Sequence, residues 1–79
     1  MHPEVCPLCE KLLDRAANAA IRHMQAIERM DLADIRGEED LLPALEMVTR
    51  EARASRENAV ASYKHHVGMH RAQRSGATA

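Results

Sequence analysis

Aromatic side chains are almost absent from this sequence, which contains no Phe, no Trp and a single tyrosine, Tyr63. Aromatic residues bury about 150–250 Å² each and supply much of the core of an ordinary small domain. The apolar share is 46%, but much of it is alanine, which buries little area. With 79 residues the chain forms one domain at most. So small a domain with so thin a core usually needs a disulfide, a metal ion or an oligomer contact for stability.

The sequence also lacks an excess of positive charge, since 11 basic and 12 acidic residues give a net charge of −1 with histidines neutral. We therefore expect no nucleic-acid partner, because proteins that bind nucleic acids carry a patch of basic residues. No apolar run reaches the roughly 18 residues of a membrane helix, so we expect no membrane contact. The first residues have neither the basic start nor the apolar core of a signal peptide. We expect a cytoplasmic location, where thiols stay reduced, so Cys6 and Cys9 are better explained as metal or redox groups than as a disulfide.

Strand signals are missing as well, because β-branched residues are few and form no alternating run. Helix formers dominate, and Pro7 suits the first position of a helix. Gly37 is typical of the residue just past a helix end, and Pro43 is tolerated only in a first turn. The sequence therefore predicts an all-α fold, a long antiparallel helical hairpin. Residues 1–74 form the single domain, with a helix over about 7–36, a turn at 37–40, a helix over about 41–72 and a flexible tail at 75–79.

Apolar residues at steps of three and four predict how the two helices pack, since this spacing is the seam of an antiparallel pair or coiled coil. The predicted stripe of the first helix is Leu13, Ala16 or Ala17, Ala20, Met24, Ile27 and Met30. That of the second is Leu41, Leu45, Val48, Ala52, Ser55, Ala59, Ser62, His66 and Met69. Leu12, Leu42, Met47 and Val60 fall outside both stripes. We expect a second hairpin to pack against these four residues in a homodimeric four-helix bundle, or another helical protein to pack there instead.

The residues that carry chemistry lie at the two outer ends of the predicted hairpin. Cys6 and Cys9 open the first helix, while His66 and His70 lie in the last turns of the second. Arms of equal length bring these ends together. Two cysteines in a Cys-x₂-Cys pair and two histidines on one helix face make a tetrahedral Cys₂His₂ set that suits zinc. The sequence therefore predicts a Zn²⁺ site on Cys6, Cys9, His66 and His70.

Other histidines are weaker candidates for this site. On a helix His65 lies about 140° around the axis from His70, whereas His66 lies only about 40° away. We therefore favour His66, with His65 or His2 as alternative ligands. His23 is about 21 Å along the helix from the cysteines and is expected to be exposed.

Other metal and haem motifs are missing from the sequence. Glu10 follows Cys9, which excludes a Cys-x-x-Cys-His haem attachment. No Glu-x-x-His or His-Glu-x-x-His occurs, which excludes the di-iron bundle and metalloprotease patterns.

Four protein ligands would leave the ion no open position for water, so the predicted zinc is structural. No acid, base and nucleophile converge in the sequence, and we expect no enzymatic activity. The predicted function is therefore a structural or protein-interaction module. The alternative is a thiol-based redox or metal sensor, in which oxidation of Cys6 and Cys9 releases zinc.

Overall fold

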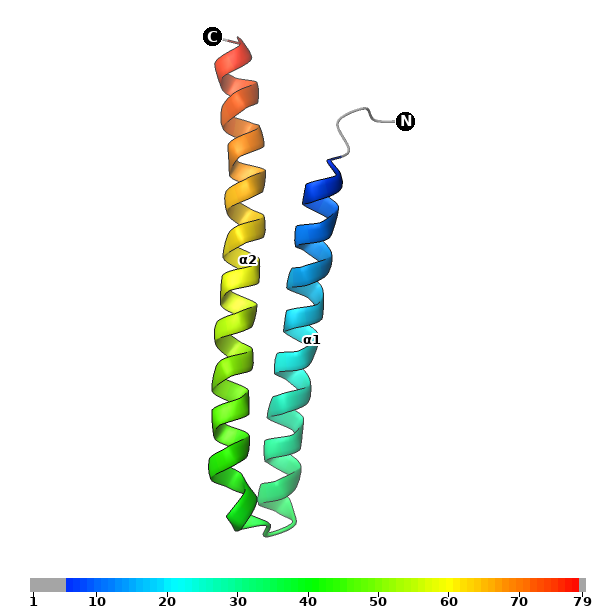
Figure 1. The fold of residues 1–79 in the computed structure, drawn as a ribbon, viewed down its shortest axis with the longest axis vertical. Helices are drawn as coiled ribbons and strands as arrows, with labels where there is room; N and C mark the ends of the chain where they lie inside the picture. Colours follow the sequence, from blue (N-terminus) through cyan, green and yellow to red (C-terminus); the bar gives the residue numbers. More distant parts are fainter. Residues whose placement is uncertain (1–5, 79) are drawn as a thin grey trace.

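Two long antiparallel helices make up the protein (Figure 1). The computed structural model describes residues 6–78, and their side chains as far as Arg71. Helix α1 spans Pro7–Ile35 and helix α2 spans Leu42–Thr78, with a short 3-10 turn, η1, at Glu39–Leu41 between them. Residues 6–78 contain no strand. The predicted all-α hairpin is confirmed.

The hairpin is elongated, with principal extents of 60 × 24 × 14 Å and a radius of gyration of 18.1 Å. A compact domain of this length would have a radius of gyration of about 12 Å. At about 1.5 Å per residue, α1 is about 44 Å long and α2 about 56 Å. The end of α2 therefore extends beyond the start of α1 (Figure 1). Neither helix has, within the described residues, a stretch long and apolar enough to cross a membrane.

Gly37 ends α1 as the sequence predicts. Its φ of +72° lies in the left-handed region that favours glycine. The Glu38 N–H donates to the Ala33 carbonyl at 2.8 Å, and the Gly37 N–H donates to the Asp34 carbonyl at 3.1 Å. This pair of bonds is the Schellman motif, which satisfies carbonyls left without partners at a helix end. The chain therefore reverses direction at a defined point.

Helix α2 begins as predicted but ends later. Pro43 lies in its first turn, where the missing N–H has no helical partner to lose. The helix continues to Thr78, whereas the sequence predicted an end near 72 and a flexible tail at 75–79. No proline stops the helix in this segment, and Gly76 costs only about 1 kcal/mol relative to alanine.

Alanine fills the interface between the helices, and on α1 it follows a line that the sequence prediction missed. The buried apolar residues are Ala16, Ala19, Ala26 and Ala33 of α1 and Ala59 of α2. His23 lies on the same line and is only 6% exposed. The predicted stripe is wrong at Leu13 and Met24, which are 50% and 65% exposed, and Ile27 is also exposed. Alanine allows the two backbones to approach closely, and the larger side chains then lie at the edge of the contact.

On α2 the predicted stripe is partly correct. Leu45, Ala52 and His66 are half-buried, whereas the other predicted positions apart from buried Ala59 are exposed. The four residues against which a second hairpin was expected to pack are also less exposed than predicted, with one exception. Leu12 and Leu42 are half-buried, Val60 packs against the alanine cluster, and only Met47 is well exposed. A second hairpin that packs here would therefore contact mainly other residues.

Candidate metal centre

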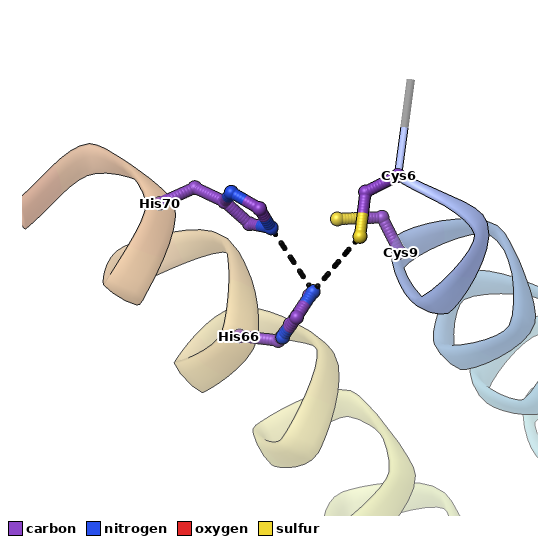
Figure 2. A group of neighbouring side chains, drawn as sticks. All are labelled: Cys6, Cys9, His66 and His70. Carbon is purple, nitrogen blue, oxygen red and sulfur yellow. Dashed lines mark hydrogen bonds between the residues drawn. The ribbon is translucent and has the colours of Figure 1, made fainter. Parts of the chain in front are cut away.

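Four side chains with metal-binding atoms meet at the open end of the hairpin, the end opposite the turn (Figure 2). They are Cys6, Cys9, His66 and His70, the residues singled out in the sequence. Their ligand atoms all lie within 4.8 Å of one another. The two cysteines come from the start of α1 and the two histidines from α2, so the group joins segments that are 60 residues apart in the chain.

The start of α1 points both thiols at α2. Cys6 is the N-cap residue, with φ −94° and ψ 118°, and its carbonyl accepts the Glu10 N–H at 3.2 Å. Pro7 follows at the first helical position, where its fixed φ is already that of a helix. The side chain of Cys6 therefore projects from the position just before the helix, and that of Cys9 projects from the first turn. This local geometry places both sulfur atoms on one side of the helix (Figure 2).

Two distances within the group are close to those in a tetrahedral zinc site. The Nε2 atoms of His66 and His70 lie 3.1 Å apart, and the Sγ of Cys6 lies 3.4 Å from the Nε2 of His66. Zinc bonds of about 2.0–2.1 Å to nitrogen and about 2.3 Å to sulfur give tetrahedron edges of about 3.3 Å and about 3.6 Å for these pairs. The histidine rings stand at 87° to each other, so each nitrogen approaches from its own direction.

The two thiols have different acidity. The hydrogen bond with His66 and, to a smaller extent, that with the backbone N–H of Cys9 lower the pKa of Cys6 to about 6. Burial raises the pKa of Cys9 above its ordinary 9.0, and the neighbouring Cys6 adds to this increase. At neutral pH the metal-free pair therefore holds one thiolate and one thiol. Thiolate is the form that binds a metal, so Cys6 is already in its binding form.

The alternative histidine ligands are not part of the described group. His65 is exposed and contributes no atom to it, as its position around the helix predicted. His2 lies outside the described residues, so its role as an alternative ligand stays a prediction.

The prediction that His23 is exposed is wrong. Its ring is buried in the middle of the hairpin, and its Nδ1 accepts a hydrogen bond from Nη1 of Arg56 at 3.1 Å. Because arginine can only donate, Nδ1 must carry a lone pair and the ring proton of a neutral His23 lies on Nε2. His23 follows Ala16 and Ala19 at helical spacing, and this alanine line was the available signal for its burial.

A metal ion held by all four residues of the group would occupy a closed site. Two sulfur and two nitrogen donors complete a tetrahedron and leave no position at which the ion could hold water. Such a site can link two chain segments but offers no reactive water or substrate position. Its interpretation depends on geometry and donor chemistry alone, because comparison with protein families, curated proteins and solved structures found no match to this chain.

Proposed function

We propose that this chain is a zinc-binding helical hairpin, in which a structural Cys₂His₂ site holds the two helices together for interaction with other proteins. One observation carries the proposal: the ligand atoms of Cys6, Cys9, His66 and His70 lie within 4.8 Å of one another, although they come from opposite ends of the chain. The role that we propose is structural and not catalytic, since the protein would occupy every position on the ion.

The composition of the group favours zinc over other metals. A tetrahedral set of two sulfur and two nitrogen donors suits zinc or an iron–sulfur centre. Iron–sulfur clusters are held mainly by cysteine, typically about four, and the sequence contains two. Copper(I) is selected by soft thiolate or thioether ligands, which make up only half of this set. Magnesium and calcium prefer oxygen donors, which are missing from the group.

A thin core explains why such a protein would need an ion. The buried apolar residues of the described chain are all alanine, and no side chain is completely shielded from solvent. Structural zinc contributes about 10–16 kcal/mol of apparent binding free energy in small zinc domains near neutral pH. The hydrophobic core of a domain this small rarely supplies more than about 3–5 kcal/mol. The ion would therefore be the largest single stabilising contribution at the open end.

The interaction role is supported by an apolar face along α1. Leu13, Met24 and Ile27 are exposed on the helix, and half-buried Val60 and Val67 lie on α2. We propose that this face packs against a second copy in a four-helix bundle, or against another helical protein. Burial of apolar area contributes about 25 cal/mol per Å². Sedimentation equilibrium should give twice the chain mass, and Met24→Glu should return the protein to a monomer. A monomer at all concentrations would leave another helical protein as the partner.

A second candidate function, a thiol-based redox sensor, is favoured by the low pKa of Cys6. Thiolates react with peroxides far faster than thiols. Cys6 and Cys9 would form one S–S bond and give two electrons to a peroxide, which leaves as water after taking up protons, while zinc is released. Treatment with hydrogen peroxide should then release zinc and form this disulfide, and a thiol reductant should reverse both changes. Unaltered zinc content at peroxide concentrations that oxidise free cysteine would exclude this role.

Metal analysis of the purified protein tests the main proposal. Protein purified without chelators should contain one zinc per chain by mass spectrometry of the elements, and Cys6→Ser or Cys9→Ser should contain none. His65→Ala provides a matched control and should retain the zinc. Absence of zinc from protein expressed in zinc-supplemented medium would contradict the proposal.

A further inference from the structure

A row of arginines runs along one edge of α1. Its seam residues Ala16, Ala19, His23, Ala26, Met30 and Ala33 alternate in steps of three and four. Arg15, Arg22 and Arg29 each immediately precede a seam residue, at intervals of seven residues, and Arg36, the C-cap residue of α1, follows at the same interval. In coiled-coil terms the three helical arginines occupy the same flanking position in three consecutive heptads. All four are exposed.

The arginines border a groove between the two helices. One hollow lies between Arg15 and Arg22 of α1 and Ser55, Asn58 and Ser62 of α2. The next lies between Arg22, Gln25 and Arg29 of α1 and Val48 and Ala52 of α2. Both include Arg22, so the two hollows lie next to each other along the hairpin, and together we name them the arginine groove. Ala19 and Ala59 line the first hollow, and Ala26 lines the second.

The charge of the arginine groove is not balanced across the hairpin. Flanking positions of paired helices usually carry opposite charges that face each other. No acidic residue is among those lining the two hollows. On the opposite face of the hairpin, the grooves mix both signs: Glu57 lies beside Arg53 and Arg56, and Glu46 lies beside Arg50. The arginine groove therefore resembles the basic side of a charge-paired interface whose acidic side is supplied by another molecule.

We infer that the arginine groove binds an acidic α-helix of a partner protein, as a third helix lying along the hairpin. Seven residues rise about 10.5 Å along a helix, so glutamates at heptad spacing on the partner would align with successive arginines. The alanines lining the groove allow the close approach, about 8–10 Å between axes, at which helices pack. This inference extends the proposed interaction role and does not depend on the metal.

Neither a second copy nor a nucleic acid fits the groove as well. No three acidic residues of this sequence are spaced seven apart, so a second copy offers no matching row. Single-stranded nucleic acid is usually bound through aromatic stacking as well as charge. The chain has no Phe or Trp and a net charge of −1. Phosphates also follow one another far more closely than arginines about 10.5 Å apart.

Two synthetic peptides test the inference. Each is a helix of about 28 residues, long enough for four heptads, with alanine on its packing face. One carries glutamate at every seventh position, and the other carries lysine at the same positions. Titration into the purified protein should show binding of the glutamate peptide only. Added salt should weaken this binding, because the contact is electrostatic and exposed.

Variants then locate the contact. Arg15→Glu/Arg22→Glu should weaken binding of the glutamate peptide at least tenfold and should favour the lysine peptide instead. Arg50→Glu/Arg53→Glu, the matched control on the opposite face, should leave the glutamate peptide bound as before. Zinc content and helical circular dichroism report folding of each variant, and Arg22→Gln offers a milder change. Failure of this test would leave the zinc content, and hence the proposed metal site, unaffected.

Three results would overturn the inference. The first is equal binding of the two peptides by the unaltered protein. The second is an equal loss of binding in both double variants. The third is tighter binding of a single-stranded oligonucleotide than of the glutamate peptide, which would indicate a nucleic-acid surface.

Discussion

The two ends of the hairpin are held together by different means. At the turn end the chain itself connects the helices, and the Schellman motif at Gly37 fixes the direction of the connection. At the open end no covalent link exists, and four side chains from α1 and α2 meet there instead. Between the ends lie mainly alanine contacts. A hairpin with a thin core needs a specific connection at each end, and we propose that a zinc ion bound by these four side chains provides the second one.

Removal of the metal should have the largest effect, and it should act on one end. Chelation, or Cys6→Ser, should lower the melting temperature and expose the first turns of α1 and the last turns of α2. The reason is that bound zinc contributes about 10–16 kcal/mol in comparable small domains. Hydrogen exchange should rise at Leu8–Leu12 well before it rises at Ala26–Ala33. Uniform exchange along the helices, or an unchanged melting temperature, would show that packing alone holds the open end.

Replacement of single histidines should have the next largest effect. His66→Ala should reduce zinc affinity by orders of magnitude, because it removes one of four ligands and the hydrogen-bond partner of Cys6. His65→Ala is the matched control, one position along the same helix and exposed, and should change affinity little. Competition with a chromophoric chelator measures both. Equal losses would mean that the wrong face of α2 has been assigned to the metal.

The acidity of the two cysteines predicts how zinc affinity varies with pH. Burial raises the pKa of Cys9, so its thiol must release a proton when zinc binds at neutral pH, and affinity should increase as pH rises. The pKa of Cys6 is lowered to about 6, so a second proton is released only below about that pH, where affinity should fall more steeply. His66→Ala should move this second change to higher pH. Zinc competition across a pH series would contradict the assignment if affinity did not change.

The smallest predicted effects come from the two described glycines and have opposite signs. Gly37 has a φ of +72°, so Gly37→Ala should destabilise the turn end by about 1 kcal/mol. Gly68 lies inside α2 between the histidines, and a Cβ there would meet no atom within 4 Å. Gly68→Ala should therefore stabilise the helix by about 0.5–1 kcal/mol. Urea unfolding measures both, and changes of the same sign would contradict this account of the helix ends.

Much of the fold and of the metal-site geometry could be predicted from the sequence because they depend on strong local signals. Pro7, Gly37 and Pro43 mark helix ends through backbone chemistry that tertiary structure rarely overrides. Cys6 and His66 lie at similar distances along the chain from the turn at Gly37, so their meeting in an antiparallel hairpin followed from geometry. Binding of an ion by this group is the part that stays a prediction.

The packing of α1 could not be predicted in the same way. Large apolar residues at Leu13, Met24 and Ile27 compete with an alanine line through Ala16 and Ala19, and both have helical spacing. Hydrophobicity favours the first line, whereas close approach of two backbones favours the second. Packing along the alanine line also buries His23, so the prediction missed both the alanine line and the buried histidine. The end of α2 was missed because a glycine in a weakly helical segment does not fix where a helix stops.

We propose that one zinc ion joins the start of α1 to His66 and His70 of α2 through two sulfur and two nitrogen atoms. X-ray absorption spectroscopy at the zinc edge tests it directly on the purified protein. We expect two sulfur atoms at about 2.3 Å and two nitrogen atoms at about 2.0–2.1 Å from the ion. A first shell of nitrogen and oxygen alone, without sulfur, would contradict it.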